Sequence, residues 1–418
     1  MTTETGNQAL FDGAIDLSQP IGSANLRIRV LEAEAGRHDS DQWRGTLDPF
    51  SWYAEKRAAG DGIHRDPTIG MWMVFRYPDV QHVLSDAATF SSQYGNLGMQ
   101  NVDPPRHRQL RLLVTHAFTP KRVESLKARI GEIADQLIDN FAEAGEADLV
   151  KDFTQPLSTT VIAELLGIPS DDHSAFRRWT QEVSLGAVRF KGREAAAEAP
   201  QQMAAYFSDM ITEAKRRPRQ DLISALLEAR VDGDKLTDAD IFNFCVLLLV
   251  AGNETTGNLI GNTVRLLSEH PDVRDEIRSD RALMKPALEE VLRYRGPLQS
   301  MLRLAPRGAT LGEHTLEPGD FVLGFIGSAN RDPKVFDDPE RFDIHRKLNR
   351  HIAFGHGGHF CLGAALARME TMTAIWSLMD RLGDVDVAVA QSDLQVLNSR
   401  VFYGMAVLPV SFKAKAAV

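Results

Sequence analysis

The sequence predicts a mainly α fold with a minor β portion, and three observations support this. From about residue 104 to residue 270, apolar residues recur three and four positions apart, as they do on the buried face of a helix. One helical candidate, Thr237–His270, is long enough at about 50 Å to cross a whole domain. The strand-like segments are short and lie mostly after residue 300. We therefore expect one compact domain built around a long helix.

In residues 1–86 the sequence predicts an arm, a short helix and a strand that leads into a second helix. Residues 1–45 are polar and lack periodicity, which predicts a partly ordered arm before a domain at 46–418. The segment DPFSWYAEKRAAG at 48–60 predicts a short capped helix. The segment GMWMVFRYPDVQHVLSD at 70–86 predicts a strand followed by a helix, because the residue before Pro78 disfavours helical backbone.

The long helix and the segments after it carry their own boundary signals. Thr237 is a candidate N-cap with Asp240 three residues later, and Pro271 ends the helix. We expect further helices in KPALEEVLRY (285–294) and in LGAALARMETMTAIWSLMDRLG (362–383). The β portion is expected in GATLGEHTLEPGDFVLGF (308–325), with a turn at Pro318-Gly319, and in a closing hairpin, LQVLNSRVFYGMAVLPVSF (394–412).

Composition and charge restrict the function classes. The formal net charge is −10 at pH 7, which disfavours a nucleic-acid binder because phosphate neutralisation needs a basic face. The two cysteines, Cys245 and Cys361, cannot build a disulfide framework and fit a reducing cytoplasm. The longest strongly apolar run, CVLLLVAG at 245–252, is too short to span a bilayer, and the N-terminus has no secretory pattern. We therefore expect a cytoplasmic protein without a membrane anchor.

Cys361 lies in the segment FGHGGHFCLG, Phe354 to Gly363, directly before the last predicted helix. A helix start favours thiolate over thiol, and the glycines allow backbone to approach a bulky group closely. Such a thiolate is a good ligand for a soft metal. A buried structural cysteine is the plainer alternative, and a zinc site made of His351, His356, His359 and Cys361 is another. Structural zinc usually recruits paired cysteines, which the sequence lacks.

The pattern Phe354-x-x-Gly357-x-His359-x-Cys361-x-Gly363 resembles the haem-binding loop of the cytochrome P450 family. Four further segments resemble family motifs in the family's order, namely DPPRHRQLR (103–111), AGNETT (251–256), EEVLR (289–293) and SANRDPKVFDDPERFDIHR (328–346). The resemblance covers about residues 48–412. It implies a single domain whose long central helix lies over a haem b group.

The resemblance implies a role for each matched residue. Cys361 would be the axial ligand of the haem iron, with Phe354 and Gly363 beside it. His107, Arg111, Arg303 and His359 would neutralise the haem propionates. The plainer interpretation of His107 and Arg111 is a solvated helix face. Alternation along a strand independently supports an inward-facing Arg303.

The middle of the long helix would be the oxygen-activation segment. Ala251 and Gly252 would lie against the haem, with Gly252 loosening the helix to make a groove for dioxygen. Thr255 would hydrogen-bond the reacting oxygen and Glu254 would relay protons from solvent. The plainer interpretation is a threonine bonded to a helix carbonyl and a glutamate that reaches solvent.

Glu290 and Arg293 lie one helical turn apart and can pair. The resemblance implies that this pair binds an arginine of the preceding meander and so holds the haem loop. Arg341 is the first choice for that arginine and Arg346 is the alternative. This role is structural.

Substrate contacts are assigned by position in the resembled family. The candidates are Tyr94, Leu97, Met99, Leu247, Val250, Ala251, Leu298, Gln299, Met301 and Phe402. Together they predict an apolar pocket for a macrolide, terpenoid, steroid or fatty acid. The loop at 93–102 is shorter than is common in the family, so we expect a more open entrance or a lid supplied by the N-terminal arm.

The resemblance implies a monomeric monooxygenase that hydroxylates or epoxidises a hydrophobic molecule with dioxygen. Electrons would come from a ferredoxin and its NAD(P)H-dependent reductase, docked on basic residues. The candidates for that dock are Arg106, Arg108, Lys121, Arg122, Arg346, Lys347 and Arg350. A peroxygenase or isomerase without a redox partner, a non-enzymatic haem protein and a zinc hydrolase are the alternatives.

Overall fold

The computed structural model describes residues 47–67, 70–95, 98–179, 198–399 and 401–413. The predicted arm at 1–45 and Leu97 lie outside these residues. The chain divides into two compact units. We call residues 1–26, 92–126 and 158–254 the helical unit, and residues 27–91, 127–157 and 255–418 the mixed unit. The expectation of a single domain over 46–418 stays a prediction.

The helical unit contains no named strand in its described part. Its elements are η2, a 3₁₀ helix at Gly98–Asn101, α5 (Arg106–Ala117), α6 (Pro120–Ser125), most of α8 (Gln155–Leu166), η5 (Ser170–Asp172), α10 (Glu198–Arg216), α11 (Leu222–Glu228) and the first half of α12. Helix α11 packs on both α10 and α5. Apolar side chains spaced three or four apart, such as Leu110, Leu113 and Val114 of α5, form its core.

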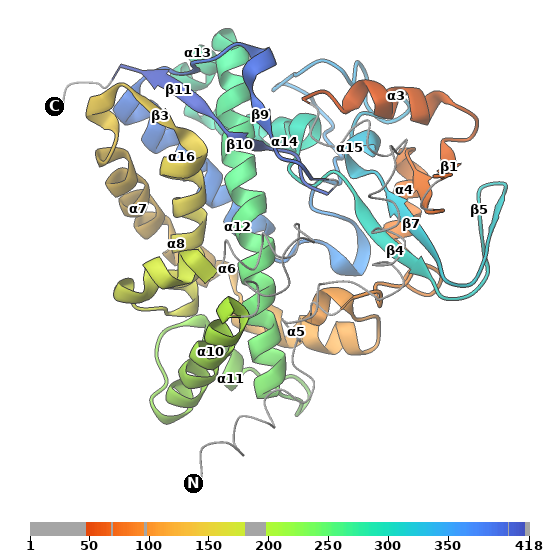
Figure 1. The fold of residues 1–418 in the computed structure, drawn as a ribbon, viewed down its shortest axis with the longest axis horizontal. Helices are drawn as coiled ribbons and strands as arrows, with labels where there is room; N and C mark the ends of the chain where they lie inside the picture. The colour runs from red at the N-terminus through yellow and green to blue at the C-terminus, as the bar shows by residue number, and fades with distance from the viewer. Residues whose placement is uncertain (1–46, 68–69, 96–97, 180–197, 400, 414–418) are drawn as a thin grey trace. The chain divides into compact units, whose positions relative to one another are not determined.

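Helix α12 (Asp238–Glu269) is the long helix that the sequence predicts, and it is labelled in Figure 1. The predicted capping box is confirmed, because the Asp240 backbone N–H donates to Thr237 Oγ1 at 3.1 Å and the Thr237 N–H donates to Asp240 Oδ2 at 3.0 Å. Pro271 begins the next helix, α13 (Pro271–Ser279). By length and composition α12 could cross a membrane, but 56% of its most apolar window is buried inside the protein, as in a core helix.

The mixed unit is built on a four-stranded sheet with the strand order β1-β2-β7-β4. Strands β1 (Ile63–Arg65) and β2 (Trp72–Val74) are antiparallel, β2 and β7 (Asp320–Gly324) are parallel, and β7 and β4 (Met301–Ala305) are antiparallel. Helices α3 (Phe50–Ala58), α4 (Tyr77–Ser85) and α15 (Ile326–Ala329) lie next to this sheet in Figure 1. Its core includes β-branched and aromatic side chains such as Val74, Val322 and Phe90, which are fully buried.

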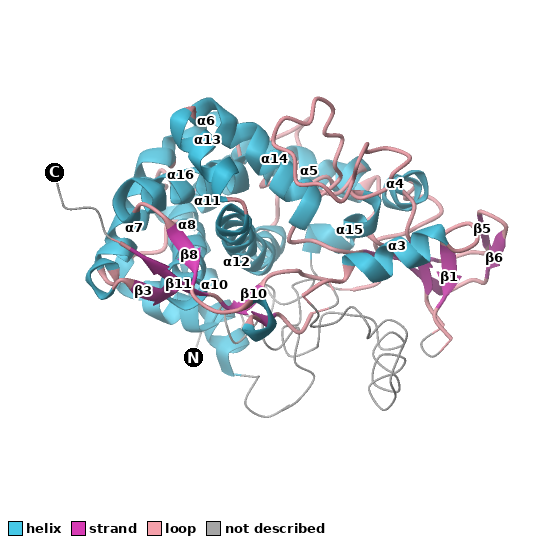
Figure 2. Ribbon diagram, turned by 90° about the horizontal axis from the view of Figure 1, so that it is seen from above, coloured by secondary structure: helices cyan, strands magenta, loops and turns pink. Residues whose placement is uncertain are grey.

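Three smaller sheets complete the mixed unit. Strands β5 (Ala309–Leu311) and β6 (His314–Leu316) form a hairpin that projects at one end of Figure 2. Strands β9 (Gln395–Val396) and β10 (Met405–Val407) form the predicted closing hairpin. The prediction that this hairpin extends to residue 412 is wrong, because β11 (Pro409–Phe412) instead pairs with β3 (Glu146–Asp148) and β8 (Val385–Val387).

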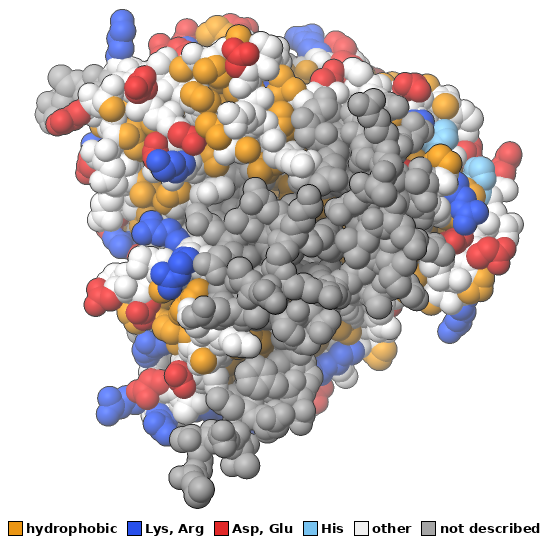
Figure 3. Space-filling model, viewed as in Figure 1, with side chains coloured by type: hydrophobic (Ala, Val, Ile, Leu, Met, Phe, Trp, Pro, Cys, Tyr) orange, Lys and Arg blue, Asp and Glu red, His pale blue; other side chains and the backbone are white. Residues whose placement is uncertain are grey.

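The remaining helices of the mixed unit carry the candidate site. Helix α16 (Ala364–Leu382) packs against α7 (Lys127–Asp139), and α14 (Met284–Arg295) contacts α16. The short helices are η3 (Ala142–Ala144), η4 (Val150–Thr154), η6 (Arg281–Leu283), η7 (Gly357–His359) and η8 (Gln391–Asp393). On the surface seen in Figure 3, basic and acidic side chains are interspersed over the described residues, so the net charge does not gather on one patch in that view.

Candidate active site

The loop that carries Cys361 is a closed turn. Gly355 and Gly357 have φ of 77° and 72°, a left-handed backbone that favours glycine. The Cys361 N–H donates to the Phe354 carbonyl at 2.8 Å, which closes the loop directly before α16. Cys361 is half-buried, so its sulfur has neither a fully apolar surrounding nor full solvation. The local sequence therefore presents one thiol at a fixed place.

One glycine of this loop marks a close approach. A Cβ on Gly357 would lie 2.9 Å from Ser85 Cα, so the loop lies directly on the end of α4. A Cβ on Gly363 would lie 4.0 Å from the Cys361 sulfur, an ordinary van der Waals distance. The expectation that the glycines admit a bulky group stays a prediction.

The alternative of a zinc site is not supported. The described residues contain no group of three or more histidine, cysteine or acidic side chains placed to hold a metal ion, and His351, His356, His359 and Cys361 are all described. His351 binds Glu289 instead, with its Nε2 2.9 Å from the carboxylate. Cys245 is fully buried in α12, and burial raises the pKa of its thiol, as expected for a core cysteine.

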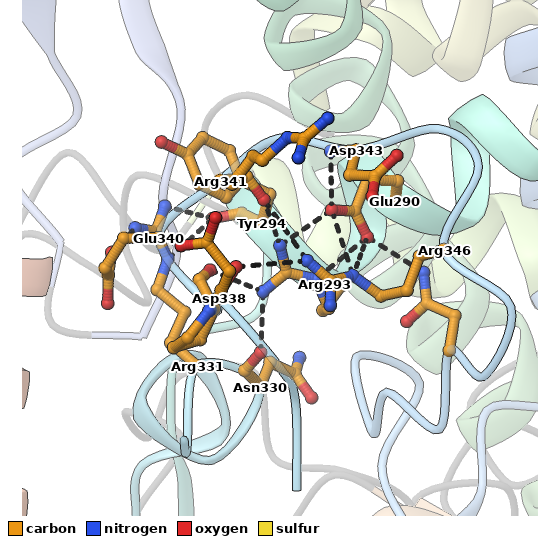
Figure 4. Close-up of polar contacts among 12 residues, drawn as sticks. Glu290, Arg293, Tyr294, Asn330, Arg331, Asp338, Glu340, Arg341, Asp343 and Arg346 are labelled. Atoms are coloured by element: carbon orange, nitrogen blue, oxygen red, sulfur yellow. Dashed lines mark hydrogen bonds and ion pairs between the residues drawn. The ribbon is translucent and has the colours of Figure 1, made fainter.

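Glu290 and Arg293 form the centre of a buried network that holds the meander after α15 (Figure 4). Arg293 donates to both oxygens of Glu290, at 2.8 and 2.7 Å, and both side chains are almost fully buried. Arg293 also donates to the carbonyls of Asn330, Pro339 and Arg341 at 2.8–3.1 Å. The predicted pair therefore exists, and it fixes main-chain positions as well as a charge.

The arginine that completes this network is Arg346, and the preference for Arg341 is wrong. Arg346 Nε lies 3.3 Å from Glu290 Oε2, whereas Arg341 contributes only its carbonyl and exposes its side chain. Sequence reasoning missed two further contacts of Glu290, from the Asp343 backbone N–H at 2.9 Å and from Asn349 Nδ2 at 3.1 Å. Loop donors of this kind have no spacing signal in the sequence.

Strand β4 carries Arg303 and helix η7 carries His359, the two residues of the mixed unit that are predicted to bind propionates. Arg303 is 3% exposed, between the half-buried Leu302 and Leu304, so the predicted alternation is confirmed. Its Nη1 donates to the Leu302 carbonyl at 2.8 Å. His359 is half-buried at the end of η7, two residues before Cys361. Burying a guanidinium is costly unless acceptors or an anion receive it, and the binding of a propionate by Arg303 stays a prediction.

In the helical unit, His107 and Arg111 lie on one face of α5, one turn apart, together with Leu110 and Val114. His107 is 3% exposed and Arg111 is half-buried. The plainer interpretation, a solvated helix face, is therefore wrong for His107. Its placement on a buried face is compatible with the role that the family resemblance implies.

The centre of α12 keeps regular helical backbone, and the predicted loosening at Gly252 is not observed. A Cβ on Gly252 would lie 2.9 Å from Ile162 of α8, so close packing of two helices accounts for this glycine. A hydrogen bond of 2.8 Å from Thr159 to Asn253 joins the same helices. Ala251, by contrast, is exposed in the middle of a largely buried helix.

Glu254 and Thr255 follow on α12, and both are half-buried. Burial raises the pKa of the Glu254 carboxyl above its ordinary value, because the charged form loses solvation. An ion pair with a cation would oppose this shift of the pKa, and none joins Glu254 to another residue of the described ranges. A carboxyl that retains its proton to higher pH suits proton transfer, which is the role expected for Glu254.

The predicted substrate contacts of the mixed unit fall into two groups. Leu298 and Phe402 are half-buried and lie opposite each other in an antiparallel bridge, and Met301 begins β4 nearby in sequence. Gln299 does not belong with them, because it is 1% exposed and its Nε2 donates to the Gly296 carbonyl at 2.6 Å. This inward placement gives Gln299 a structural role, and its predicted contact with substrate stays a prediction.

The helical unit contains a small cavity of about 190 Å³ between η2, α5 and α12. It is lined by Gly95, Gly98, Met99, Asn101, Val102, Arg106, Leu110, Val114, Leu236, Asp240, Asn243 and Phe244. Among the predicted substrate contacts, Met99 lines it, Tyr94 is half-buried beside it in sequence, and Leu247 and Val250 continue the α12 face by one and two turns. The expected open entrance stays a prediction, although η2 shows that this short loop has one ordered turn.

The arrangement of these elements agrees with what comparison with known proteins finds. The sequence model of the cytochrome P450 family matches residues 73–383, about three quarters of the chain. The chain belongs to the cytochrome P450 family.

Relatives and solved structures in the family cover nearly the whole chain. The cytochrome P450 monooxygenase PikC of Streptomyces venezuelae is 38% identical over 386 residues, 88% of this chain and 91% of its own length. The mycinamicin IV hydroxylase/epoxidase of Micromonospora griseorubida is 38% identical over 355 residues, 81% of this chain and 89% of its own. The crystal structure of CYP109E1 from Bacillus megaterium with testosterone has a TM-score of 0.82 at 37% identity, covering 87% of this chain and 99% of that one.

Membership of the P450 family makes the protein a haem-dependent monooxygenase, and its residues fit that cofactor. The mixed unit supplies a half-buried thiol in a closed loop and a buried arginine, Cys361 and Arg303. The helical unit supplies the buried His107 and the exposed Ala251 in a core helix. Haem binding of this kind uses a thiolate ligand for the iron and cations for the propionates, and a small residue leaves room for the ring.

Proposed function

We propose that this P450 uses dioxygen and two electrons from separate redox proteins to hydroxylate or epoxidise a hydrophobic small molecule. The observation that carries this proposal is Glu254, a half-buried carboxyl in the apolar α12, directly before Thr255. An enzyme that reduces dioxygen must deliver protons to it, whereas a peroxygenase, an isomerase or a haem carrier has no such need. Haem b, held by Cys361, supplies the oxygen-activating chemistry.

The chain's own residues bind and orient the cofactor. Cys361 provides the sulfur, and the hydrogen bond to Phe354 fixes the backbone from which the sulfur projects. Gly363 keeps space next to the sulfur. We assign Arg303 and His359 of the mixed unit, and His107 and Arg111 of the helical unit, to the propionates, because each is a cation or a potential cation with a buried or half-buried side chain.

Glu254 and Thr255 move the protons. Glu254 is protonated from solvent at a carboxylate oxygen, and burial raises the pKa of this carboxyl, which favours the protonated form. The Thr255 hydroxyl donates its own proton at the reaction centre. It then takes up the proton that Glu254 carries. Ala251, exposed one turn earlier, leaves room at that centre.

The substrate class follows from apolar candidate contacts and from the relatives. The candidate contacts are apolar: Leu298, Met301, Phe402 and Val250 are half-buried, Met99 lines the cavity, and Leu247 is buried on α12. Relatives that act on mycinamicin IV and cyclomarin C, and a structural neighbour that binds testosterone, are enzymes of large apolar molecules. We propose a macrocyclic or polycyclic natural product as substrate.

A ferredoxin and its NAD(P)H-dependent reductase are the proposed electron source, in the cytoplasm and with a monomeric enzyme. The exposed cations Arg108, Lys121, Lys347 and Arg350 are available to an acidic partner. Two residues of the expected dock are engaged elsewhere, because Arg106 binds Asp240 at 2.9 Å and Arg346 binds Glu290.

Optical titration of the ferric holoprotein with macrolides, steroids, terpenoids and fatty acids tests the proposal. A low-to-high-spin shift with one class, followed by NAD(P)H-dependent oxygenation of that compound with added ferredoxin and reductase, is the expected result. Oxygenation that proceeds equally well with hydrogen peroxide and without electron donors would contradict it, in favour of a peroxygenase.

A further inference from the structure

Two neighbouring glutamates of α14 bind different partners. Glu290 binds Arg293 and the meander, as described above. Glu289 binds Arg368 of α16 through two parallel hydrogen bonds, from Nε at 2.6 Å and from Nη2 at 2.8 Å. Paired bonds between a guanidinium and a carboxylate fix the orientation of both groups. Burial opposes the charge on Glu289, but the hydrogen bonds from Arg368 and His351 prevail and lower its pKa to about 2.

His351 attaches the start of the cysteine loop to the same carboxylate. Its Nε2 lies 2.9 Å from Glu289 Oε2, and its Nδ1 lies 3.2 Å from the Ala353 backbone N–H. Because the Ala353 N–H can only donate, Nδ1 accepts and Nε2 carries the proton that is donated to Glu289. One histidine therefore links a carboxylate of α14 to the main chain that leads to Phe354.

Arg368 contacts the same loop at Phe354. Its guanidinium carbon lies 4.4 Å from the centre of the Phe354 ring, a cation–π contact. Phe354 in turn accepts the Cys361 N–H at 2.8 Å. The contacts thus form one chain, from Glu289 through Arg368 and His351 to the ring and the carbonyl of Phe354, and from there to the backbone of Cys361.

We propose that Glu289, His351 and Arg368 are positioning residues that hold the cysteine loop in the geometry required for thiolate ligation. This inference rests on the proposed function, since it concerns the ligand that Cys361 provides to haem. The Glu290 network holds the meander, whereas this group holds the loop itself. His351 acts on the loop through the Ala353 N–H, and Arg368 acts on it through the Phe354 ring.

A second group on α16 offers a control. Arg281 binds Asp380 of α16 at 2.5 Å and lies over the Trp376 ring at 4.3 Å, which repeats the arrangement of an arginine, an acid and an aromatic ring. Neither of these two contacts involves the cysteine loop. The side chains of Arg281 and Asp380 are more exposed, at 61% and 49%, than those of Arg368 and Glu289, at 28% and 25%. Loss of Arg281 therefore reports the cost of a surface group of this kind, and loss of Arg368 reports the cost of a less exposed pair together with any effect on the loop.

The experiment compares Arg368→Ala, Glu289→Gln and Arg281→Ala holoproteins with the wild type. The ferrous–CO spectrum gives the fraction of haem with thiolate ligation, and its decay in dilute denaturant gives the rate at which ligation is lost. The ferric/ferrous potential is measured in parallel. We expect Arg368→Ala to lose the thiolate band about tenfold faster, because a charge-assisted paired contact is removed, and its potential to shift. Glu289→Gln, which keeps the side-chain volume, should shift both quantities in the same direction, and Arg281→Ala neither.

The outcomes separate this inference from the proposed function. A wild-type spectrum without a thiolate band would overturn the haem-thiolate function itself. A normal wild-type band together with Arg368→Ala and Glu289→Gln proteins that match Arg281→Ala in decay rate and potential would overturn only the positioning role. If Arg368→Ala does not retain haem, Glu289→Gln decides between the two results.

Discussion

The cysteine loop and the cavity region at residues 94–102 are organised by different interactions. The loop is held by the Glu289 carboxylate and the meander that leads to it by the Glu290 carboxylate, each with several charge-assisted hydrogen bonds to side chains or backbone. Half of the residues that line the cavity are apolar, and the others are glycine, asparagine and the half-exposed pair of Arg106 and Asp240. The first region is therefore fixed by networks of buried charges, whereas the second combines apolar packing with a single charged pair.

This difference matches what each region has to do. A metal ligand must keep one position through every turnover, and networks of hydrogen-bonded charges specify one geometry. A pocket for a hydrophobic molecule needs volume and adaptable side chains, and methionine is suited to that purpose. Substitutions in the first region should change ligation or stability, whereas those in the second should change which molecule binds.

The largest effect is expected for Glu290→Ala. It leaves Arg293 and Arg346 without their carboxylate, and Arg293 is 1% exposed. An unpaired buried charge of this kind costs about 3–5 kcal/mol in free energy of unfolding. Chemical denaturation measures it. Glu132→Ala is the control, since Glu132 pairs with Arg129 three residues away but on the surface, and should cost less than about 1 kcal/mol. Equal costs would contradict the account.

Thr255→Ala should leave the fold intact and uncouple electron consumption from product. Without its hydroxyl, proton transfer to the reaction centre slows by a factor on the order of 10² or more. Hydrogen peroxide per NAD(P)H then rises while product falls, which peroxide and product assays measure together. Thr263→Ala is the control, because Thr263 lies on the same helix and only bonds the Leu259 carbonyl, at 2.7 Å. Normal coupling in Thr255→Ala would remove the role assigned to this residue.

Glu254→Gln should change how activity and stability depend on pH. Because burial raises the folded-state pKa of Glu254, the carboxyl favours folding below its unfolded pKa, and this contribution is lost as pH rises through the folded pKa. Stability of Glu254→Gln relative to wild type should therefore increase from acidic to neutral pH. The fall in wild-type product formation as the carboxyl loses its proton should also disappear. Parallel pH profiles of the two proteins would show that Glu254 does not titrate in this range.

The smallest effect is expected for Met99→Ala in the cavity region. Met99 is 8% exposed and lines the cavity of about 190 Å³, so its truncation enlarges that space. The dissociation constant of the spin-shifting ligand should change severalfold, with the preference moving toward bulkier compounds. Met210→Ala, a methionine of α10 that is equally buried but does not line the cavity, controls for stability. Unchanged ligand preference in Met99→Ala would separate this cavity from substrate binding.

The sequence predicted the elements whose residues act locally. Three such elements are the capping box of α12, helix α16 and the Glu290–Arg293 pair. Each depends on residues a few positions apart, so spacing alone predicts it. It did not predict that β11 leaves the closing hairpin, nor that Arg346 rather than Arg341 reaches Glu290. Those outcomes depend on contacts between residues far apart in the chain.

The site shows the same division. The thiol of Cys361 and the buried strand position of Arg303 could be identified from motif and alternation. The inward turn of Gln299 could not, because the Gly296 carbonyl that it binds becomes available only where α14 ends. The link from Glu289 to the cysteine loop also escaped prediction, since His351 and Arg368 are 62 and 79 residues away in sequence.

The central claim is that Cys361 is the thiolate ligand of a haem, and the ferrous–CO spectrum of reconstituted protein tests it most directly. We predict that the wild type shows the absorption band of a thiolate-ligated complex, and that Cys361→Ala binds haem without this band. Cys245→Ala, which removes the cysteine buried in α12, should keep it. A thiolate band that persists in Cys361→Ala, or a wild-type protein that takes up no haem, would contradict the account.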